Sequence, residues 1–181
     1  RLVHYRETVP PKKQFAACPF WRKPVSGFGD PEAKLLILGL APSADGANRT
    51  GRIFTGDPSA RFLMRALFET GFSNQPDSES KNDGLLLYKA YMTPVVKCVP
   101  PDNKPSLLEI RTCRRYLVEE FQCLKSLKTV LALGSVAFYS YLKLAESLGE
   151  SVKASFKHGA IVRFVTLPTL FASYHPSPQN T

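Results

Sequence analysis

Three segments that lie far apart in the sequence carry side chains able to do chemistry. The first covers residues 39–57, where glycines surround the carboxylate of Asp45, the amide of Asn48 and the ring of Phe54. Glycines and a proline interrupt regular structure over this stretch, and so long a loop is uncommon in a compact domain unless it is functional. Backbone donors beside one aromatic ring predict a ligand pocket, and a structural turn is the alternative interpretation.

The glycine spacing in this loop excludes two common nucleotide-binding motifs. No Gly-Lys-Ser/Thr follows it, as a phosphate-binding P-loop requires. The intervals between Gly39, Gly46 and Gly51 also differ from those of the dinucleotide-binding fingerprint. The loop therefore has to be interpreted together with other parts of the chain.

The second segment is His175-Pro176-Ser177, close to the end of the sequence. A single histidine is more often structural than catalytic. This one follows a strand-like run, and the proline after it favours an extended turn. We expect His175 at the carboxyl end of the last strand, the sheet edge at which the 39–57 loop opens. Ligands bind at this edge in open α/β sheets.

The third segment contains two cysteines, Cys98 and Cys113, which flank a proline-rich loop and the start of a helix. Their spacing alone is weak evidence for a metal site, and two buried thiols are the simpler interpretation. Cys18 lies far from them in sequence and Cys123 lies inside the helix expected over 105–124, and we expect both in the core. Because no secretion signal is visible, disulfide bonds are not expected.

The elements that must position these side chains follow from hydrophobic periodicity. We expect strands over 34–40, within 85–96, over 129–133 and over 161–167, and helices over 58–69, 105–124 and 136–148. Asp57 and Pro58 form a typical helix start. Residues 1–34 are expected to form an irregular lead-in. Strands that alternate with helices predict an α/β fold, a three-layer α/β/α arrangement with a four-stranded, mostly parallel central sheet.

Composition narrows the class of protein further. The 181 residues carry a net charge of +9, which favours a polyanionic partner such as nucleic acid, although a merely basic surface explains it equally well. No apolar run approaches the roughly 20 residues of a membrane helix. We expect one domain over 1–181, monomeric, without a membrane partner, cytoplasmic and associated with the nucleoid. The chain starts at Arg1 and stops within an apparent motif at 178–181, so we expect both ends to be trimmed.

Taken together, the three segments resemble the uracil-DNA glycosylase superfamily. The resemblance rests on Gly-Leu-Ala-Pro and Asn-Arg-Thr-Gly-Arg-Ile-Phe-Thr-Gly-Asp within 39–57, on Cys-Val-Pro-Pro from Cys98 with a second cysteine at 113, and on the His-Pro-Ser at 175–177. In order and separation these motifs are similar to family 5, the B type of thermophilic archaea and some bacteria.

The resemblance implies an enzyme that removes uracil, and also hypoxanthine and xanthine, from DNA and leaves an abasic site. Its partner would be DNA containing deaminated bases, with the damaged base flipped out of the duplex. The base-binding residues would be Gly39, Ala41, Phe54 and Ser177. Phe54 would stack on the base and His175 would donate a hydrogen bond near its O2. For holding the attacking water, Asn48 is the first candidate and Asp45 the second.

The sequence departs from this resemblance at two positions. Many relatives carry Asp or Asn at the position of Ala41 to hold the water, and alanine cannot do so. Where families 1 and 4 read the uracil edge with an asparagine, this chain has Pro94. A pocket without that reader should accept larger bases, which agrees with a broad substrate range.

Families 4 and 5 also carry a structural [4Fe–4S] cluster held by four cysteines, and Cys98 and Cys113 match the second pair of its ligands. The chain contains no Cys-x-x-Cys to match the first pair. Either the first two ligands lie upstream of Arg1, which is the interpretation we favour, or the cluster is absent.

Two other functions fit parts of the sequence. A non-catalytic module that binds abasic DNA would keep the same fold, and Ala41 favours it. A flavodoxin-like nucleotide-binding protein would explain the loop after the first strand, although the basic charge and the His-Pro-Ser motif argue against it. Treatment of uracil-containing DNA followed by alkali separates the enzyme from the module, and a nucleotide titration tests the third possibility.

Overall fold

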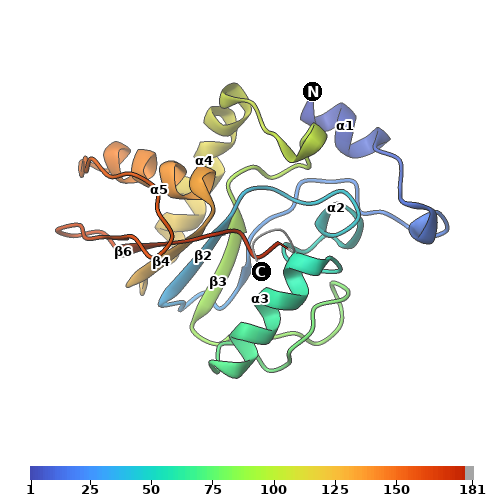
Figure 1. Ribbon diagram of the computed structural model, residues 1–181, viewed down its shortest axis with the longest axis horizontal. Coiled ribbons are helices and arrows are strands. Elements are labelled where there is room, and N and C mark those ends of the chain that lie inside the picture. The colour runs from blue at the N-terminus through green and yellow to red at the C-terminus, as the bar shows by residue number, and fades with distance from the viewer. Residues whose placement is uncertain (178–181) are drawn as a thin grey trace.

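The computed structural model describes residues 1–177, which surround a six-stranded mixed sheet (Figure 1). In chain order the strands are β1 (Phe28–Gly29), β2 (Leu35–Gly39), β3 (Ala90–Pro94), β4 (Thr129–Leu133), β5 (Ile161–Val162) and β6 (Thr169–Ser173). Their spatial order is β1-β3-β2-β4-β6-β5. The inner four are parallel, and the two-residue strands at the edges are antiparallel to their neighbours. The predicted mostly parallel central sheet is thus present, with six strands instead of four.

Helices cover both faces of this sheet. The chain has five helices within the described residues, α1 (Leu2–Thr8), α2 (Ala47–Thr50), α3 (Pro58–Glu69), α4 (Leu107–Cys123) and α5 (Ser135–Ser147), and single 3-10 turns lie at Lys13–Phe15 and Pro101–Asn103. Figure 1 shows α3 on one side of the strands and α4 and α5 on the other. The three-layer α/β/α fold expected from the sequence is therefore confirmed.

The apolar run of β2 explains why both faces need a cover. Leu36 and Leu38 belong to the core that includes residues of α4 and α5, whereas Ile37 belongs to the core that includes residues of α3. Successive side chains of a strand point to opposite faces, so a continuous apolar run is typical of a strand buried on both sides.

The helix starts follow from local side-chain chemistry. Asp57 caps α3 because its Oδ1 accepts the Ala60 N–H at 2.9 Å, and Pro58 occupies the first helical position, as predicted. At α4, Ser106 and Glu109 form a reciprocal capping box. These caps fix where each helix leaves the loop before it.

The predicted strand over 161–167 was wrong for most of its length. Only Ile161–Val162 pairs, at the sheet edge, and the fourth parallel strand is β6. The carboxylate of Glu150 accepts the backbone N–H groups of Val165, Thr166 and Leu167, at 2.6–3.0 Å. A side chain therefore bonds the donors that a strand would have given to a neighbour.

The lead-in differs from the irregular segment that we expected, since it opens with helix α1. Among the described residues, no helix is long and apolar enough to span a bilayer. The expected break in a motif at 178–181 lies outside the described residues.

Candidate active site

The candidate site lies where β2 and β6 end. These strands flank β4 and run parallel, so their carboxyl ends lie at the same edge of the sheet. The 39–57 loop leaves β2, and His175 follows β6 by two residues. The loop brings Phe54 to His175, with ring centroids 6.4 Å apart and an angle of 30° between the ring planes. The structure thus places side by side the two rings, 121 positions apart in sequence (175 minus 54), that the sequence analysis assigned to one pocket.

Phe54 is held against the end of β2 in an unusual backbone conformation. Its φ is +49°, in the left-handed region, and its side chain is almost fully buried. A Cβ built on Gly39 would lie 2.8 Å from Phe54 Cζ, a distance too short for two carbon atoms. Glycine at position 39 therefore makes room for the ring, which gives this predicted base-binding residue a steric role.

His175 is half-buried, and burial lowers its pKa below the usual 6.5. The charge of Asp57 opposes this shift, so that carboxylate lies close enough to influence the ring. The Ser177 N–H donates to the His175 carbonyl at 2.8 Å, which closes a tight turn around Pro176. At neutral pH the imidazole is uncharged and carries one N–H donor.

A residue that the sequence analysis missed, Ser43, holds Asp57 in place. The Ser43 hydroxyl donates to Asp57 Oδ2 at 2.5 Å while Oδ1 caps α3. Gly46 fits against this pair, since a Cβ there would lie 2.3 Å from Ser43 Oγ and 2.4 Å from Asp57 Oδ2. The sequence signal for Ser43 was only its position in the glycine-rich loop.

Asn48 and Asp45 make contacts with the lead-in. Asn48 is buried in α2, and its Nδ2 donates to the Arg6 carbonyl at 3.1 Å. Asp45 accepts the Lys12 N–H at 3.1 Å and pairs with Lys12 Nζ at 3.5 Å. Both side chains thus fasten the loop to residues 6–12, and a role for either in holding the attacking water stays a prediction.

The two positions that depart from the resemblance lie at the ends of neighbouring strands. Ala41 is half-buried beyond β2 and packs on the core beneath α4 and α5. Pro94 ends β3 and pairs in register with Gly39. Neither side chain has a polar atom, so hydrogen bonding at this edge has to come from the loop, the backbone and the His175 segment.

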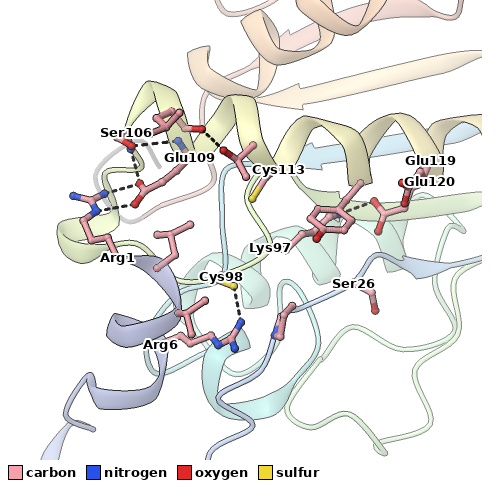
Figure 2. Close-up of a pocket in the computed structure, with 16 residues that line it drawn as sticks. Arg1, Arg6, Ser26, Lys97, Cys98, Ser106, Glu109, Cys113, Glu119 and Glu120 are labelled. Carbon is pink, nitrogen blue, oxygen red and sulfur yellow. Dashed lines mark hydrogen bonds and ion pairs between the residues drawn. The ribbon is translucent and has the colours of Figure 1, made fainter.

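Cys98 and Cys113 are buried thiols that line one cavity of about 800 Å³ (Figure 2). Arg6 Nη1 donates to Cys98 Sγ at 3.2 Å. Arg1 and Leu2 also line this cavity, so the start of the chain and both sulfurs face the same cavity. Within residues 1–177, no group of three or more His, Cys, Asp or Glu side chains is placed to hold a metal ion.

The remaining two cysteines are not in the core. Cys18 and Cys123 are exposed, so their prediction as core residues was wrong. Cys18 lies in the lead-in beyond the 3-10 turn, and Cys123 is the last residue of α4. Neither lines the cavity of Cys98 and Cys113.

The glycine-rich loop and the histidine thus meet at one edge of a mostly parallel sheet. Residues 26–181 match the model of the Uracil DNA glycosylase superfamily, which consists of enzymes that cleave N-glycosidic bonds. Three similar proteins carry the name type-5 uracil-DNA glycosylase. That of Thermus thermophilus is 46% identical over 182 residues, covering 100% of this chain and 82% of its own.

The other two cover nearly the same region. The Pyrobaculum aerophilum protein is 44% identical over 180 residues, 99% of this chain and 77% of its own, and the Mycobacterium tuberculosis protein is 42% identical over 183 residues, 99% and 68% respectively. The chain therefore belongs to the type-5 uracil-DNA glycosylase family. These matches confirm the family and the enzyme class expected from the sequence.

Proposed function

We propose that this protein hydrolyses the bond between uracil and deoxyribose in DNA and leaves an abasic site. The observation that carries the proposal is the meeting of Phe54 and His175 at the carboxyl edge of the sheet. The names of the type-5 relatives support the same substrate. The net charge of +9 supports DNA as the partner, because lysine and arginine contacts to phosphates dominate affinity for nucleic acid.

The first step is capture of the base outside the duplex. Flipping costs a few kcal/mol in unstacking and unpairing. Stacking on an aromatic ring returns about 1–3 kcal/mol per base, and Phe54 is an aromatic ring that lies at this edge beside His175. Phosphate contacts from the basic surface offset the remainder. Phe54 therefore binds the flipped base by its face, which does not distinguish one base from another.

The second step is cleavage. As the glycosidic bond breaks, the sugar gains positive charge and the base leaves as an anion. His175, uncharged because burial lowers its pKa, donates its N–H to the base near O2 and stabilises that anion. Water then attacks C1′. Asn48 and Asp45 are the candidates to orient this water.

We extend the proposal to hypoxanthine and xanthine. Pro94 offers neither a backbone N–H nor a polar side-chain atom to read the edge of uracil. A site that recognises bases mainly by stacking accepts a purine more readily than one built to bond a uracil edge. Release of each base from otherwise identical duplexes tests this breadth.

The cavity beside α1 fits part of a [4Fe–4S] site. Cys98 and Cys113 supply two thiols, and the Arg6 guanidinium donates to Cys98 Sγ at 3.2 Å. Because Arg1 lines the same cavity, residues upstream of it would enter next to both sulfurs. We propose that they hold a structural cluster with two further cysteines there. Iron and sulfide analysis of an anaerobic full-length preparation, with Cys98→Ser as the comparison, tests this.

A DNA-damage binding module is the second candidate function. It is favoured by one observation, that the hydrogen bonds of Asn48 and Asp45 run to the lead-in. Such a module would bind abasic or uracil-containing duplexes without turnover.

The deciding experiment uses a labelled duplex with a single uracil, treated with protein and then with alkali. We expect strand breaks with the wild-type chain. With His175→Ala we expect base release to be slower on the order of 100- to 1000-fold, the effect of removing one donor to a developing anion. Circular dichroism serves as the folding control. Tight binding without breaks at any protein concentration would establish the binding module, and undiminished turnover by His175→Ala would exclude the imidazole from the reaction.

A further inference from the structure

The backbone of Phe54 requires support from its surroundings. Residues with a side chain rarely adopt a φ near +49°, and such a conformation persists only where neighbouring contacts determine it. The ring packs against Gly39, but this contact restrains only the side chain and does not fix the backbone conformation of Phe54. The residues on either side of Phe54 have to supply the remaining restraint.

Both flanks of Phe54 are tied to one polar segment, residues 78–83. On the C-terminal side, Thr55 is fully buried, its Oγ1 lies 2.6 Å from Ser78 Oγ, and the Gly56 N–H donates to the Ser78 carbonyl at 2.7 Å. On the N-terminal side, Arg52 Nη2 donates to Ser78 Oγ at 2.8 Å. The segment therefore holds the chain just before and just after the strained residue.

Arg52 is the centre of this network. It is 4% exposed, and its guanidinium lies over the ring of Phe28 at 5.0 Å. Its Nε donates to Thr55 Oγ1 at 2.9 Å, which bridges the two flanks of Phe54 directly. Its Nη2 pairs with Asp83 Oδ2 at 2.6 Å. A buried guanidinium needs such a partner, since an unpaired charge is costly away from water.

Asp83 organises the segment that receives Arg52. Its Oδ2 also accepts the N–H groups of Glu79 and Ser80, at 2.9 and 3.2 Å, and its Oδ1 accepts that of Leu85 at 3.0 Å. Burial raises the pKa of Asp83, but Arg52 and these backbone donors together outweigh it and lower the pKa to about 2, so the carboxylate is ionised at neutral pH. One carboxylate therefore folds the segment and holds the arginine.

We propose that Arg52 and Asp83 are positioning residues for base capture, because their buried pair fixes Phe54 against Gly39 and beside His175. The inference rests on the proposed function, since it assigns to this pair the geometry of the stacking ring. Neither residue needs to touch the substrate. We call this Arg52–Asp83 pair the clamp, and it acts on the substrate only through Phe54.

The test is a double-mutant cycle between Asp83→Asn and Phe54→Ala. In single-turnover reactions on a uracil duplex, we expect Asp83→Asn to raise the half-saturating protein concentration roughly tenfold, within the range that one base–aromatic stack contributes. In the Phe54→Ala background the same change should have less than a twofold effect. Full additivity of the two changes would overturn the proposal.

Two further measurements separate positioning from general loss of stability. Leu144→Ala removes a buried side chain of α5 from the core opposite α3 and should leave half-saturation unchanged. Hydrogen exchange of the 51–57 amides should accelerate in Asp83→Asn and not in Leu144→Ala. Equal acceleration in both variants would count against the clamp. Ser78→Ala, a milder cut of the same network, replaces Asp83→Asn if that variant does not fold.

The cycle remains informative if the wild-type chain does not release uracil. That result would refute the proposed function. Affinity for a duplex with an abasic-site analogue, together with amide exchange, would still show whether Asp83 acts through Phe54.

Discussion

At the scale of single residues, the state of His175 decides how the leaving base is stabilised. Burial lowers its pKa below 6.5, and the nearby Asp57 charge only partly opposes this shift. An imidazole that stays neutral through neutral pH can donate one hydrogen bond without adding a charge that DNA phosphates would bind. The pH dependence of the rate therefore tests the protonation state of His175, whereas His175→Ala tests whether the ring is needed at all.

We expect the single-turnover rate to be flat from neutral pH upward, because the lowered pKa leaves His175 as a neutral donor there. A rate that declines as the pH rises, with a midpoint near or above pH 6.5, would show that the imidazolium is the active form. The folded chain binds this proton more weakly than the unfolded chain does. The His175 contribution to the free energy of unfolding is therefore complete above pH 6.5 and is lost as the pH falls through the lowered pKa. An NMR titration of the His175 ring gives the midpoint directly.

At the scale of elements, α3 connects the stability of the fold to the geometry of the site. Asp57 caps this helix through Oδ1, and its Oδ2 holds Ser43 in the glycine-rich loop. The same carboxylate acts on the pKa of His175. Because Asp57 acts on Ser43, Ala60 and His175 together, its replacement should change both the stability of the fold and the pKa of His175.

We expect Asp57→Ala to lower the free energy of unfolding by about 0.5–2 kcal/mol, the usual cost of losing an N-cap, as measured by urea denaturation. The variant should also lower the pKa of His175 further, since the opposing charge is gone. Ser43→Ala is the matched control, because it removes the loop contact and keeps the cap. Equal stability losses in the two variants would argue that the cap contributes little.

The sequence allowed most of these elements to be predicted, for identifiable reasons. Buried parallel strands such as β2 leave an unbroken apolar run, and Asp57-Pro58 is a local signal for a helix start. The error at 161–167 came from a contact distant in sequence, since Glu150 bonds backbone donors 15–17 residues away. No periodicity reports such a contact.

The same distinction applies to the site. Phe54 and His175 could be placed from motifs and from the rule that parallel strands share a carboxyl edge. The partners of Asn48 could not, because they depend on α1, whose fold no strong pattern announced. Nor could the Arg52 network, whose partners lie 26–31 residues further on in a polar loop. The sequence motifs therefore located the reactive side chains, whereas the contacts that support them could be identified only in the folded structure.

At the scale of the whole molecule, the net charge of +9 includes lysines beside the glycine-rich loop. Lys81 Nζ and Lys23 Nζ lie 4.4 and 5.4 Å from the centroid of Trp21, and a Cβ on Gly51 would lie 2.9 Å from that ring. Both lysines are exposed. They are therefore placed to meet phosphates of a DNA strand that approaches this loop.

We expect DNA affinity to fall steeply with salt, and Lys81→Ala to reduce the slope of log K against log salt by roughly 0.9, the value for one phosphate contact on duplex DNA. Fluorescence anisotropy on an undamaged duplex measures this slope. Lys143→Ala is the control, because Lys143 lies on α5 and pairs with Glu146. The same decrease in both variants would show that charge alone matters and that the position of Lys81 does not.

The two-residue strands at the edges of the sheet affect how readily the protein aggregates at high concentration. A long unpaired strand invites neighbouring molecules to add their own backbone, which is how many aggregates begin. Here β1 and β5 each offer only one or two peptide groups before the chain turns away. The exposed edges of the sheet are therefore short, and they offer little template on which a strand of another molecule could pair.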